Sequence, residues 1–280
     1  AVGEEVSEFK AERIGEDRGM LGEIFNLKIS FRNESREPLI LVAKFAALRE
    51  ETLDIAKRGH THQRELRSYS ELLSSAPVSV PQFIGSWYND ETSEFVLLQE
   101  MIVADTSVDQ IAGLSEKQAR LVIAEMAKLH AFWWNDPKLE TLSWLQRLDD
   151  ERRRTNLTAN TRNGWEHLAK ILDGEISLSS IDKTGEDLAD QVDEMLCRTA
   201  KFPSTFIHSD LRADNLLFSL DGESVALIDW QGSCIAPPVF DFAYFLIQSL
   251  TIENRKRLEQ DLIRFYAEES EPLNHAYGTN

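Results

Sequence analysis

Residues 5–45 and 81–99 carry a pattern of hydrophobic and polar positions that is typical of β-strands. Phe25, Leu27, Ile29 and Phe31 alternate with polar neighbours, as in a half-buried strand. Apolar runs predict further strands at residues 39–45, 81–87 and 94–99, with a turn at Asn89-Asp90 between the last two. Residues 61–75, which lie between these strands, are expected to form a helix.

From Ile102 onward the periodicity becomes helical. Ser115 and Gln118 have the spacing of a capping box, which predicts the start of a helix. Apolar residues then recur at helical spacing until the helix ends at residues 135–137. Residues 138–200 are expected to be mostly helical, with polar interruptions near residues 160–164 and 177–185, and residues 239–268 to be helical and amphipathic.

A β-rich first part and a helical second part predict an α+β protein with two lobes. We place the N-terminal lobe at residues 1–102, a hinge at about residues 99–103, and the C-terminal lobe at residues 103–280. The chain of 280 residues is long enough for one large domain or for two lobes with a sizeable core.

The charge balance limits the partners that we expect. With 30 basic and 48 acidic residues, the formal net charge is −18, which argues against a nucleic-acid partner and against an anionic membrane surface. This charge is compatible with a cationic substrate, although the need for solubility explains it equally well. The oligomeric state is left open.

The remaining composition indicates an ordinary globular protein of a reducing compartment rather than a disulfide-rich or zinc-stabilised domain. Cys197 and Cys234 are too few and too far apart for a disulfide scaffold, and the six histidines lack the spacing of a zinc site. The sequence contains no run of 18 apolar residues and no signal-peptide pattern at its start. A cytoplasmic location is therefore expected.

Candidate chemistry is concentrated in residues 206–231, FIHSDLRADNLLFSLDGESVALIDWQ. Residues 215–220 and 224–229 flank Asp221-Gly222, a turn signal, and predict a hairpin whose facing residue numbers sum to about 444. Asn215 would then face Asp229, with Cβ atoms roughly 4.5–5.5 Å apart. Each residue alone could be a simple turn residue. Together they offer two hard oxygen donors, which Mg²⁺ binds alongside substrate phosphates and water.

These residues carry a resemblance to a known superfamily. The stretch HSDLRADN (residues 208–215) resembles the H-R-D-x-x-x-x-N loop of protein kinases, and Ile228-Asp229-Trp230 resembles the strand-end D-F-G element. The I-D-W form and the later FDFAYF resemble the small-molecule branch, which includes aminoglycoside phosphotransferases and choline kinases. KQARLVIAEMAKLHAFWW and IDWQ…FDFAYFLIQSL are most similar to the ecdysteroid-kinase-like family. The resemblance implies a bilobal protein-kinase-like fold and covers most of residues 9–268, except residues 138–200.

The resemblance assigns roles within the 208–229 segment. Asp210 matches the base that accepts the proton of the substrate hydroxyl, and Asn215 and Asp229 match the two metal ligands. Arg212 lies where protein kinases place a lysine beside the transferred phosphate, so it is expected to stabilise negative charge.

Other residues of this region match supporting positions. His208 is expected to brace the loop rather than to react, and Asp241 matches an acid at a helix start that supports the loop. Ser209 departs from the glycine that is usual in the small-molecule branch. Its side chain could form a local hydrogen bond or could crowd the loop, and the sequence leaves both open.

In the N-terminal lobe the resemblance implies a nucleotide site. Lys44 lies near the end of an apolar strand, where its amine could snorkel to water; the functional interpretation pairs it with Glu65 and with the α- and β-phosphates of ATP. Glu65 begins ELRSY, which is similar to the family's E-x-x-F-Y helix, and Glu71 is the competing acid.

The remaining nucleotide contacts would come from the backbone. Gly15, Gly19 and Gly22 would let N–H groups approach phosphates, although their spacing is not G-x-G-x-x-G. The backbone groups of Glu100 and Ile102, in the hinge, are expected to bind adenine.

Several other motifs are interpreted as structural. His130 and the tryptophans at positions 133, 134, 144 and 165 are expected to belong to the core, although the tryptophans could line an acceptor pocket. The run Arg152-Arg153-Arg154 is expected to form a solvated face.

The sequence therefore predicts an ATP- and Mg²⁺-dependent phosphotransferase that acts on a hydroxyl of a small molecule. An apolar alcohol such as a steroid is favoured as acceptor, and a cationic acceptor such as choline or an aminoglycoside is the alternative. A catalytically silent nucleotide-binding scaffold of the same fold is the alternative from another class. A protein kinase fits less well, because Pro237-Pro238 follows Asp229 too closely for an activation segment.

Overall fold

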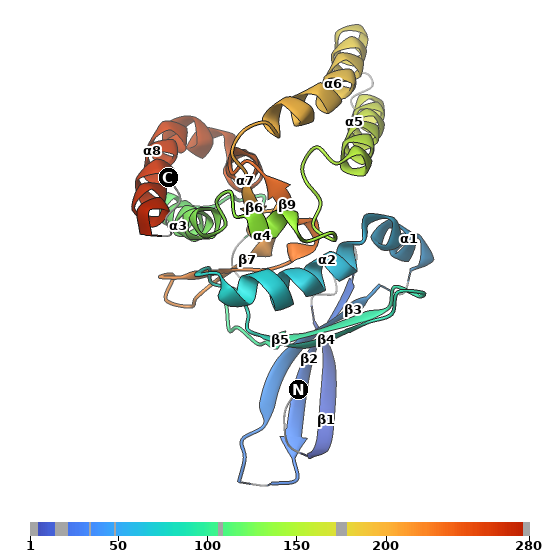
Figure 1. Ribbon diagram of the computed structural model, residues 1–280, viewed down its shortest axis with the longest axis vertical. Helices are drawn as coiled ribbons and strands as arrows, with labels where there is room; N and C mark the ends of the chain where they lie inside the picture. Colours follow the sequence, from blue (N-terminus) through green and yellow to red (C-terminus); the bar gives the residue numbers. More distant parts are fainter. Residues whose placement is uncertain are drawn as a thin grey trace.

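The computed structural model describes residues 5–14, 22–33, 35–47, 49–105, 109–171 and 178–276. Its N-terminal part is a five-stranded antiparallel sheet in the order β1-β2-β3-β5-β4, seen at the bottom of Figure 1. The strands are β1 (Val6–Ile14), β2 (Gly22–Phe31), β3 (Leu39–Ala46), β4 (Phe83–Tyr88) and β5 (Phe95–Glu100). The strands predicted from alternation are confirmed.

Two helices connect β3 with β4. They are α1 (Glu50–Gly59), which the sequence pattern did not predict, and α2 (Thr61–Arg67). His60 separates them in a left-handed conformation (φ 50°). The helix expected at residues 61–75 is continuous but changes type, because a π-helical turn (Ser68–Leu72) and a 3₁₀ turn (Leu73–Ser75) follow α2.

The second part of the chain is mostly helical. The predicted capping box is confirmed at the start of α3. The Ser115 hydroxyl accepts from the Gln118 backbone N–H, and the Gln118 side-chain oxygen accepts from the Ser115 backbone N–H. The described α-helices after β5 are α3 (Glu116–Phe132), α4 (Pro137–Glu140), α5 (Glu151–Ile171), α6 (Leu178–Thr199), α7 (Val239–Ser249) and α8 (Ile252–Ala276). No described helix is long and apolar enough to cross a membrane.

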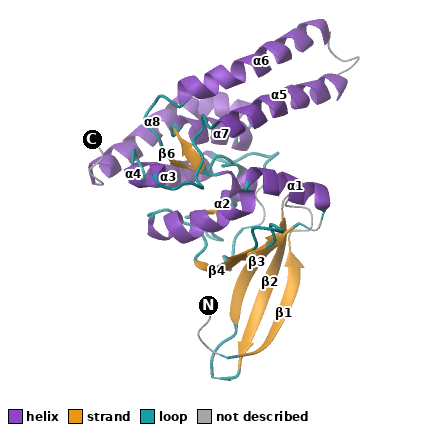
Figure 2. Cartoon of the chain, turned by 45° about the vertical axis from the view of Figure 1, so that its right-hand side comes forward, coloured by secondary structure: helices purple, strands orange, loops and turns teal. Residues whose placement is uncertain are grey.

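Helices α5 and α6 lie side by side and project from the rest of the molecule (Figures 1 and 2). Two expected interruptions are wrong here. The α5 helix runs through residues 160–164, and α6 begins at Leu178, so residues 178–185 are helical. Gly164 is tolerated because one glycine weakens a helix by only about 1 kcal/mol.

Four short strands lie in and directly after the candidate segment, residues 206–231. They form two antiparallel pairs, β6 (Thr205–Ile207) with β9 (Cys234–Ala236), and β7 (Leu216–Phe218) with β8 (Val225–Leu227). The β7–β8 hairpin is shorter than predicted, and its facing residue numbers sum to 443, as in Leu216 opposite Leu227. The expected pairing of Asn215 with Asp229 is therefore wrong by one residue. The Asn215 carbonyl accepts from Ile228 N–H (3.1 Å), and Asp229 lies one residue beyond.

A continuous core underlies this region. Trp230 is fully buried, stacks on Phe206 with ring centroids 5.6 Å apart, and donates its indole N–H to the Leu227 carbonyl (3.2 Å). His130, expected to be a core residue, is also buried, with its Nδ1 2.9 Å from the Tyr266 hydroxyl. The segment that carries the candidate chemistry is thus anchored in the core through the stacked rings of Phe206 and Trp230.

Candidate active site

The two parts of the chain meet at an ion-paired triad. Lys44 on β3 donates to Oε1 of Glu65 on α2 (2.9 Å) and to Oδ1 of Asp229 (2.7 Å). Its side chain is only 13% exposed, so the amine does not snorkel to water. The predicted pairing with Glu65 is confirmed. Glu71, the competing acid, binds Arg67 (2.5 Å) instead.

The electrostatics of the triad keep Lys44 charged. Burial favours the neutral amine, but Asp229 and Glu65 outweigh this effect and raise the pKa of Lys44 above its ordinary value. Burial favours the neutral form of both carboxyls and so tends to raise their pKa. For Asp229, Lys44 outweighs burial and holds the pKa below its ordinary value. For the more deeply buried Glu65, burial dominates and raises the pKa to about 7. Asp229 is therefore the carboxylate that stays ionised.

Asp229 occupies an unusual backbone position two residues after the end of β8. Its φ of 67° is left-handed, a conformation that Asp tolerates better than most residues, and it precedes a 3₁₀ turn (Trp230–Gly232). This reversal of the chain places its carboxylate beside Lys44 rather than in line with the hairpin.

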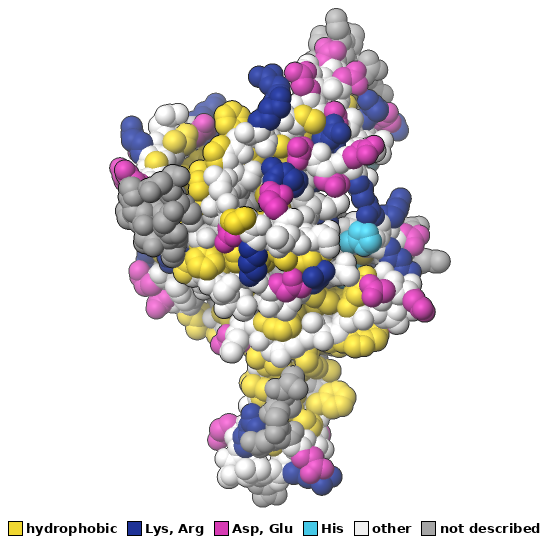
Figure 3. All heavy atoms as spheres, viewed as in Figure 1, with side chains coloured by type: hydrophobic (Ala, Val, Ile, Leu, Met, Phe, Trp, Pro, Cys, Tyr) yellow, Lys and Arg dark blue, Asp and Glu magenta, His cyan; other side chains and the backbone are white. Residues whose placement is uncertain are grey.

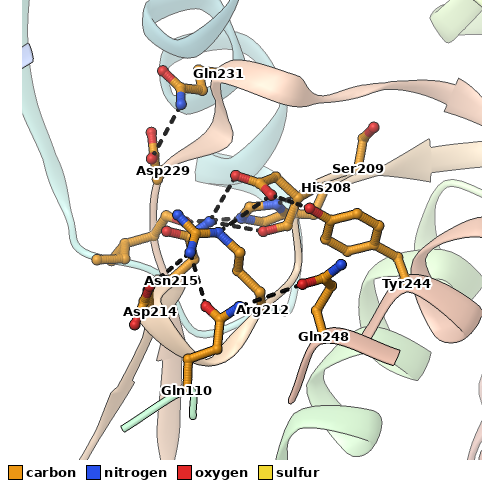
Figure 4. A network of polar contacts seen from close by, with 12 residues as sticks. Gln110, His208, Ser209, Arg212, Asp214, Asn215, Asp229, Gln231, Tyr244 and Gln248 are labelled. Atoms are coloured by element: carbon orange, nitrogen blue, oxygen red, sulfur yellow. Dashed lines mark hydrogen bonds and ion pairs between the residues drawn. The ribbon is translucent and has the colours of Figure 1, made fainter. Parts of the chain in front are cut away.

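Asp210 lies in a second polar cluster, in which Figure 4 labels its partners Tyr244, Arg212 and Asn215. Its Oδ1 accepts from the Tyr244 hydroxyl (2.8 Å) and lies 3.5 Å from Nε of Arg212, and its Oδ2 accepts from the Asn215 amide (3.1 Å). The same amide nitrogen also donates to the Asp210 carbonyl (2.7 Å). Because the NH₂ group of Asn215 is committed to Asp210, its side-chain oxygen is the atom left to bind a cation.

The loop that carries Asp210 is braced by buried side chains. Asp241, in the first turn of α7, accepts from the backbone N–H groups of His208 (2.7 Å) and Ser209 (2.6 Å). His208 accepts the Asp210 N–H on Nδ1 (3.2 Å), so its Nε2 carries the proton and donates to the Ile228 carbonyl (2.8 Å). Both side chains are fully buried. These contacts agree with the bracing that the sequence suggested.

The donor chemistry fits Mg²⁺. Asn215 and Asp229 supply an amide oxygen and a carboxylate, which are hard ligands. Within the described part of the chain, no group of three or more His, Cys, Asp or Glu residues could hold a metal ion by itself. A site with two protein donors suits Mg²⁺, which keeps several water or phosphate ligands.

The nucleotide-binding predictions fall partly outside the described residues. Gly15 and Gly19 lie in the undescribed stretch. Gly22 opens β2, and a Cβ there would lie 2.8 Å from the Phe45 carbonyl and 3.3 Å from Cε of Lys44. A side chain at Gly22 would therefore displace Lys44, which gives this glycine a packing role that its spacing did not suggest.

The hinge residues differ in their free backbone groups. The Glu100 N–H already donates to the Gln82 carbonyl (2.9 Å). Ile102 forms no backbone hydrogen bond within the described ranges. A base at the hinge would therefore not find the N–H of Glu100 available.

Sequence reasoning missed three side chains around Asp210. Tyr244 and Gln248 are on α7, and Gln110 follows the undescribed residues 106–108. Arg212 donates to Gln110 (2.8 Å) and to Asp214 (2.6 Å), and Gln110 contacts Gln248 (3.4 Å), as Figure 4 shows. Tyr244 had one available signal, since it follows Asp241 by three residues and so shares its face of the helix.

The expected solvated face at residues 152–154 is wrong for two of its three arginines. Arg154 is paired with Asp193 (2.6 Å) on α6. Arg153 donates to the Ser209 hydroxyl and to the Gly232 carbonyl (3.4 Å). Only Arg152 is exposed. The sequence Arg152-Arg153-Arg154 alone gave no indication that Arg153 and Arg154 form contacts within the protein.

Comparison with known proteins gives one family and one fold. The sequence profile of the ecdysteroid kinase-like family matches residues 17–273. Among curated proteins, none matches the chain significantly.

Solved structures share the architecture at low identity. Aminoglycoside phosphotransferase APH(3'')-Id from Streptomyces rimosus, in complex with ADP and streptomycin, is 16% identical, with a TM-score of 0.56 over 95% of this chain and 90% of that one. An ethanolamine kinase from Plasmodium vivax is 16% identical, with a TM-score of 0.54 over 96% and 73%. The GDP and kanamycin complex of APH(2")-IIia is 13% identical, with a TM-score of 0.51 over 96% and 84%. At such identities the similarity establishes the fold.

Proposed function

The chain belongs to the ecdysteroid kinase-like family of small-molecule phosphotransferases, and we propose that it transfers the γ-phosphoryl group of ATP to a hydroxyl of a small molecule. The observation that carries this proposal is the contact of Lys44 with Asp229 across 185 positions of sequence. It brings a permanent cation of the sheet next to an ionised carboxylate of the helical part. An unsupported buried ion pair is costly, so a pair held in place here fits a functional site.

Each residue of the site has a role in this reaction. The bond between the γ-phosphorus and the β,γ-bridging oxygen breaks, and a bond forms between that phosphorus and the acceptor oxygen. Asp210 accepts the proton of the acceptor hydroxyl. Its carboxylate is held in position for this by hydrogen bonds from Tyr244 and Asn215. Lys44 binds the α- and β-phosphates, and Arg212 offsets charge on the transferred group.

The site would hold Mg²⁺ through Asn215 and Asp229. The bound ion would neutralise phosphate charge and help to align the nucleotide. The adenine would lie against the hinge at about residues 99–103, where the Glu100 carbonyl and the Ile102 backbone can bind its edge, and Gly19 and Gly22 would approach the phosphates. In this assignment residues 1–102 form the nucleotide-binding lobe and residues 103–280 the acceptor-binding lobe.

The surroundings of Asp210 favour an uncharged acceptor. The side chains next to it are a phenol, amides and the guanidinium of Arg212, and the nearby carboxylate of Asp214 is neutralised by that guanidinium. Two acids on α6 are paired with arginines of α5, Asp190 with Arg162 (3.0 Å) and Asp193 with Arg154 (2.6 Å). On the face seen in Figure 3, acidic and basic side chains are interspersed over α5 and α6 rather than forming an acidic rim. A cationic acceptor would find little complementary charge there.

The proposal is tested by measuring ADP formation from Mg-ATP in the presence of candidate acceptors. The panel contains an ecdysteroid, a simple apolar alcohol, ethanolamine, choline, streptomycin and kanamycin. We expect turnover with an uncharged alcohol and its loss by at least about 10³-fold in Asp210→Asn, because a positioned base contributes roughly 10²–10⁴-fold.

Other outcomes assign the chain differently. Turnover with only the cationic compounds would overturn the acceptor class. Nucleotide binding without transfer to any member, and without ATP hydrolysis, would favour a silent scaffold.

A further inference from the structure

Ser209 has a backbone conformation that its side chain disfavours. Its φ is 68°, in the left-handed region where L-residues other than glycine are strained. It directly precedes Asp210, so the orientation of Asp210 depends on this strained torsion. The Ser209 backbone N–H donates to the Asp241 carboxylate (2.6 Å), which restrains the backbone but not the side chain of Ser209.

Arg153 holds the other side of Ser209. This arginine lies in the first turn of α5, and its guanidinium donates to the Ser209 hydroxyl through Nη2 and to the Gly232 carbonyl through Nη1 (3.4 Å). Gly232 packs against the same loop, since a Cβ there would lie 3.3 Å from the His208 carbonyl. One side chain thus connects the loop of Asp210 with the turn that follows Asp229.

The charges around Arg153 do not explain its position. No described carboxylate forms a salt bridge with it, and its Nε is buried without a partner. Arg64 approaches from α2 and donates to the neighbouring Gln231 carbonyl (2.9 Å). Burial and the charge of Arg153 lower the pKa of Arg64 to about 10. The guanidinium of Arg153 is therefore held by neutral acceptors despite repulsion from Arg64, and the contact with Ser209 is the one that bears on the reaction centre.

We propose that Arg153 is a positioning residue that holds Ser209 in its left-handed conformation and thereby aims Asp210 at the acceptor. It also makes the α5–α6 pair, which projects from the molecule, part of the support of the reaction centre. This inference rests on the proposed kinase function for its kinetic consequence, but not for its structural one.

The test is a double-mutant cycle of Arg153→Met and Ser209→Gly. The rate measured is kcat for Mg-ATP hydrolysis, in which water takes the place of the acceptor. We expect Arg153→Met to lower kcat about tenfold, about 1.4 kcal/mol of barrier, with KM for Mg-ATP unchanged. In the Ser209→Gly background the same substitution should change kcat by less than about twofold, because glycine adopts this conformation without support.

A matched control and a second readout separate the alternatives. Arg152→Met removes the exposed neighbour on the same helix and should leave kcat unchanged. Hydrogen exchange at the Ser209 and Asp210 amides should be faster in Arg153→Met than in the unmodified chain, and this difference should vanish in the Ser209→Gly background.

Equal slowing of kcat in both backgrounds, or unchanged exchange, would overturn the role of Arg153. If the unmodified chain does not turn over Mg-ATP at all, the proposed function fails, and the exchange measurement alone still decides whether Arg153 positions the loop.

Discussion

At the scale of single residues, the reaction centre consists of groups whose polar atoms are already committed. Asp210 accepts from Tyr244 and Asn215, and Lys44 is shared between Glu65 and Asp229. Lys44 and Glu65 could be predicted because an amine in an apolar strand is unusual and because residues 65–69 resemble the family's E-x-x-F-Y helix. Tyr244 was missed because a tyrosine in an amphipathic helix is ordinarily a packing residue, and its spacing from Asp241 was its one signal.

The Tyr244 hydroxyl should affect the chemical step rather than nucleotide binding. Burial and the hydrogen bond to Asp210 raise the pKa of Tyr244, so it remains a donor. We expect Tyr244→Phe to lower kcat about tenfold, since hydrogen bonds to charged groups contribute roughly 1.5–3 kcal/mol, with KM for Mg-ATP unchanged. Steady-state kinetics would measure this. Tyr88→Phe, which removes a hydroxyl 3.4 Å from Ser93 on the sheet, is the control, and equal kcat values for the two variants would contradict the assignment.

Glu65 should make stability depend on pH in a defined direction. Its folded pKa of about 7 is above the ordinary 4.5, so the folded state binds the proton more tightly than the unfolded state does. The resulting stability is fully present below about pH 4.5 and is lost as the pH rises to about 7.

Glu65→Gln removes this titration. We expect the variant to gain stability relative to the unmodified chain between pH 4.5 and pH 8, by at most about 3 kcal/mol. Urea unfolding at several pH values would measure the difference. A constant difference across that range would show that Glu65 does not titrate as described.

At the scale of elements, local patterns predicted the type of most strands and helices but not their register or ends. Hairpin register was wrong by one residue because the turn closed by the Ser219–Ser224 hydrogen bond fixes it, and alternation does not encode the length of that turn. The α5 helix continues through Gly164 because its packing against α6 outweighs one weak position. Spacing and resemblance identified the acidic and amide residues of the site. They did not show that Asn215 contacts Asp210 whereas Asp229 contacts Lys44.

Two glycines should respond to the same substitution with opposite signs. Gly22→Ala places a Cβ 2.8 Å from a backbone oxygen and should destabilise the chain by about 1–3 kcal/mol and weaken ADP binding. Gly164→Ala meets nothing within 4 Å and should stabilise α5 by about 0.5–1 kcal/mol. Chemical denaturation measures both. Stabilisation by Gly22→Ala would show that the strand has room at Lys44.

At the scale of the whole molecule, the sheet and the helical part meet at a contact between residues 185 positions apart. The division into a β-rich and a helical part could be predicted from the change of periodicity near residue 102. The role of α5 could not, because the motifs that carry the resemblance lie on either side of residues 138–200 and not within them. Arg153 is accordingly recognised only from its position beside Ser209.

The most direct test of this account is a calorimetric titration of ADP, with and without Mg²⁺, into the unmodified chain and into Asp229→Asn. We expect Mg²⁺ to tighten ADP binding by at least about tenfold in the unmodified chain, about 1.4 kcal/mol, and to have no such effect in the variant. If ADP does not bind, or if Mg²⁺ affects ADP binding equally in both proteins, the claim that Asp229 and Lys44 form a metal-nucleotide site is contradicted.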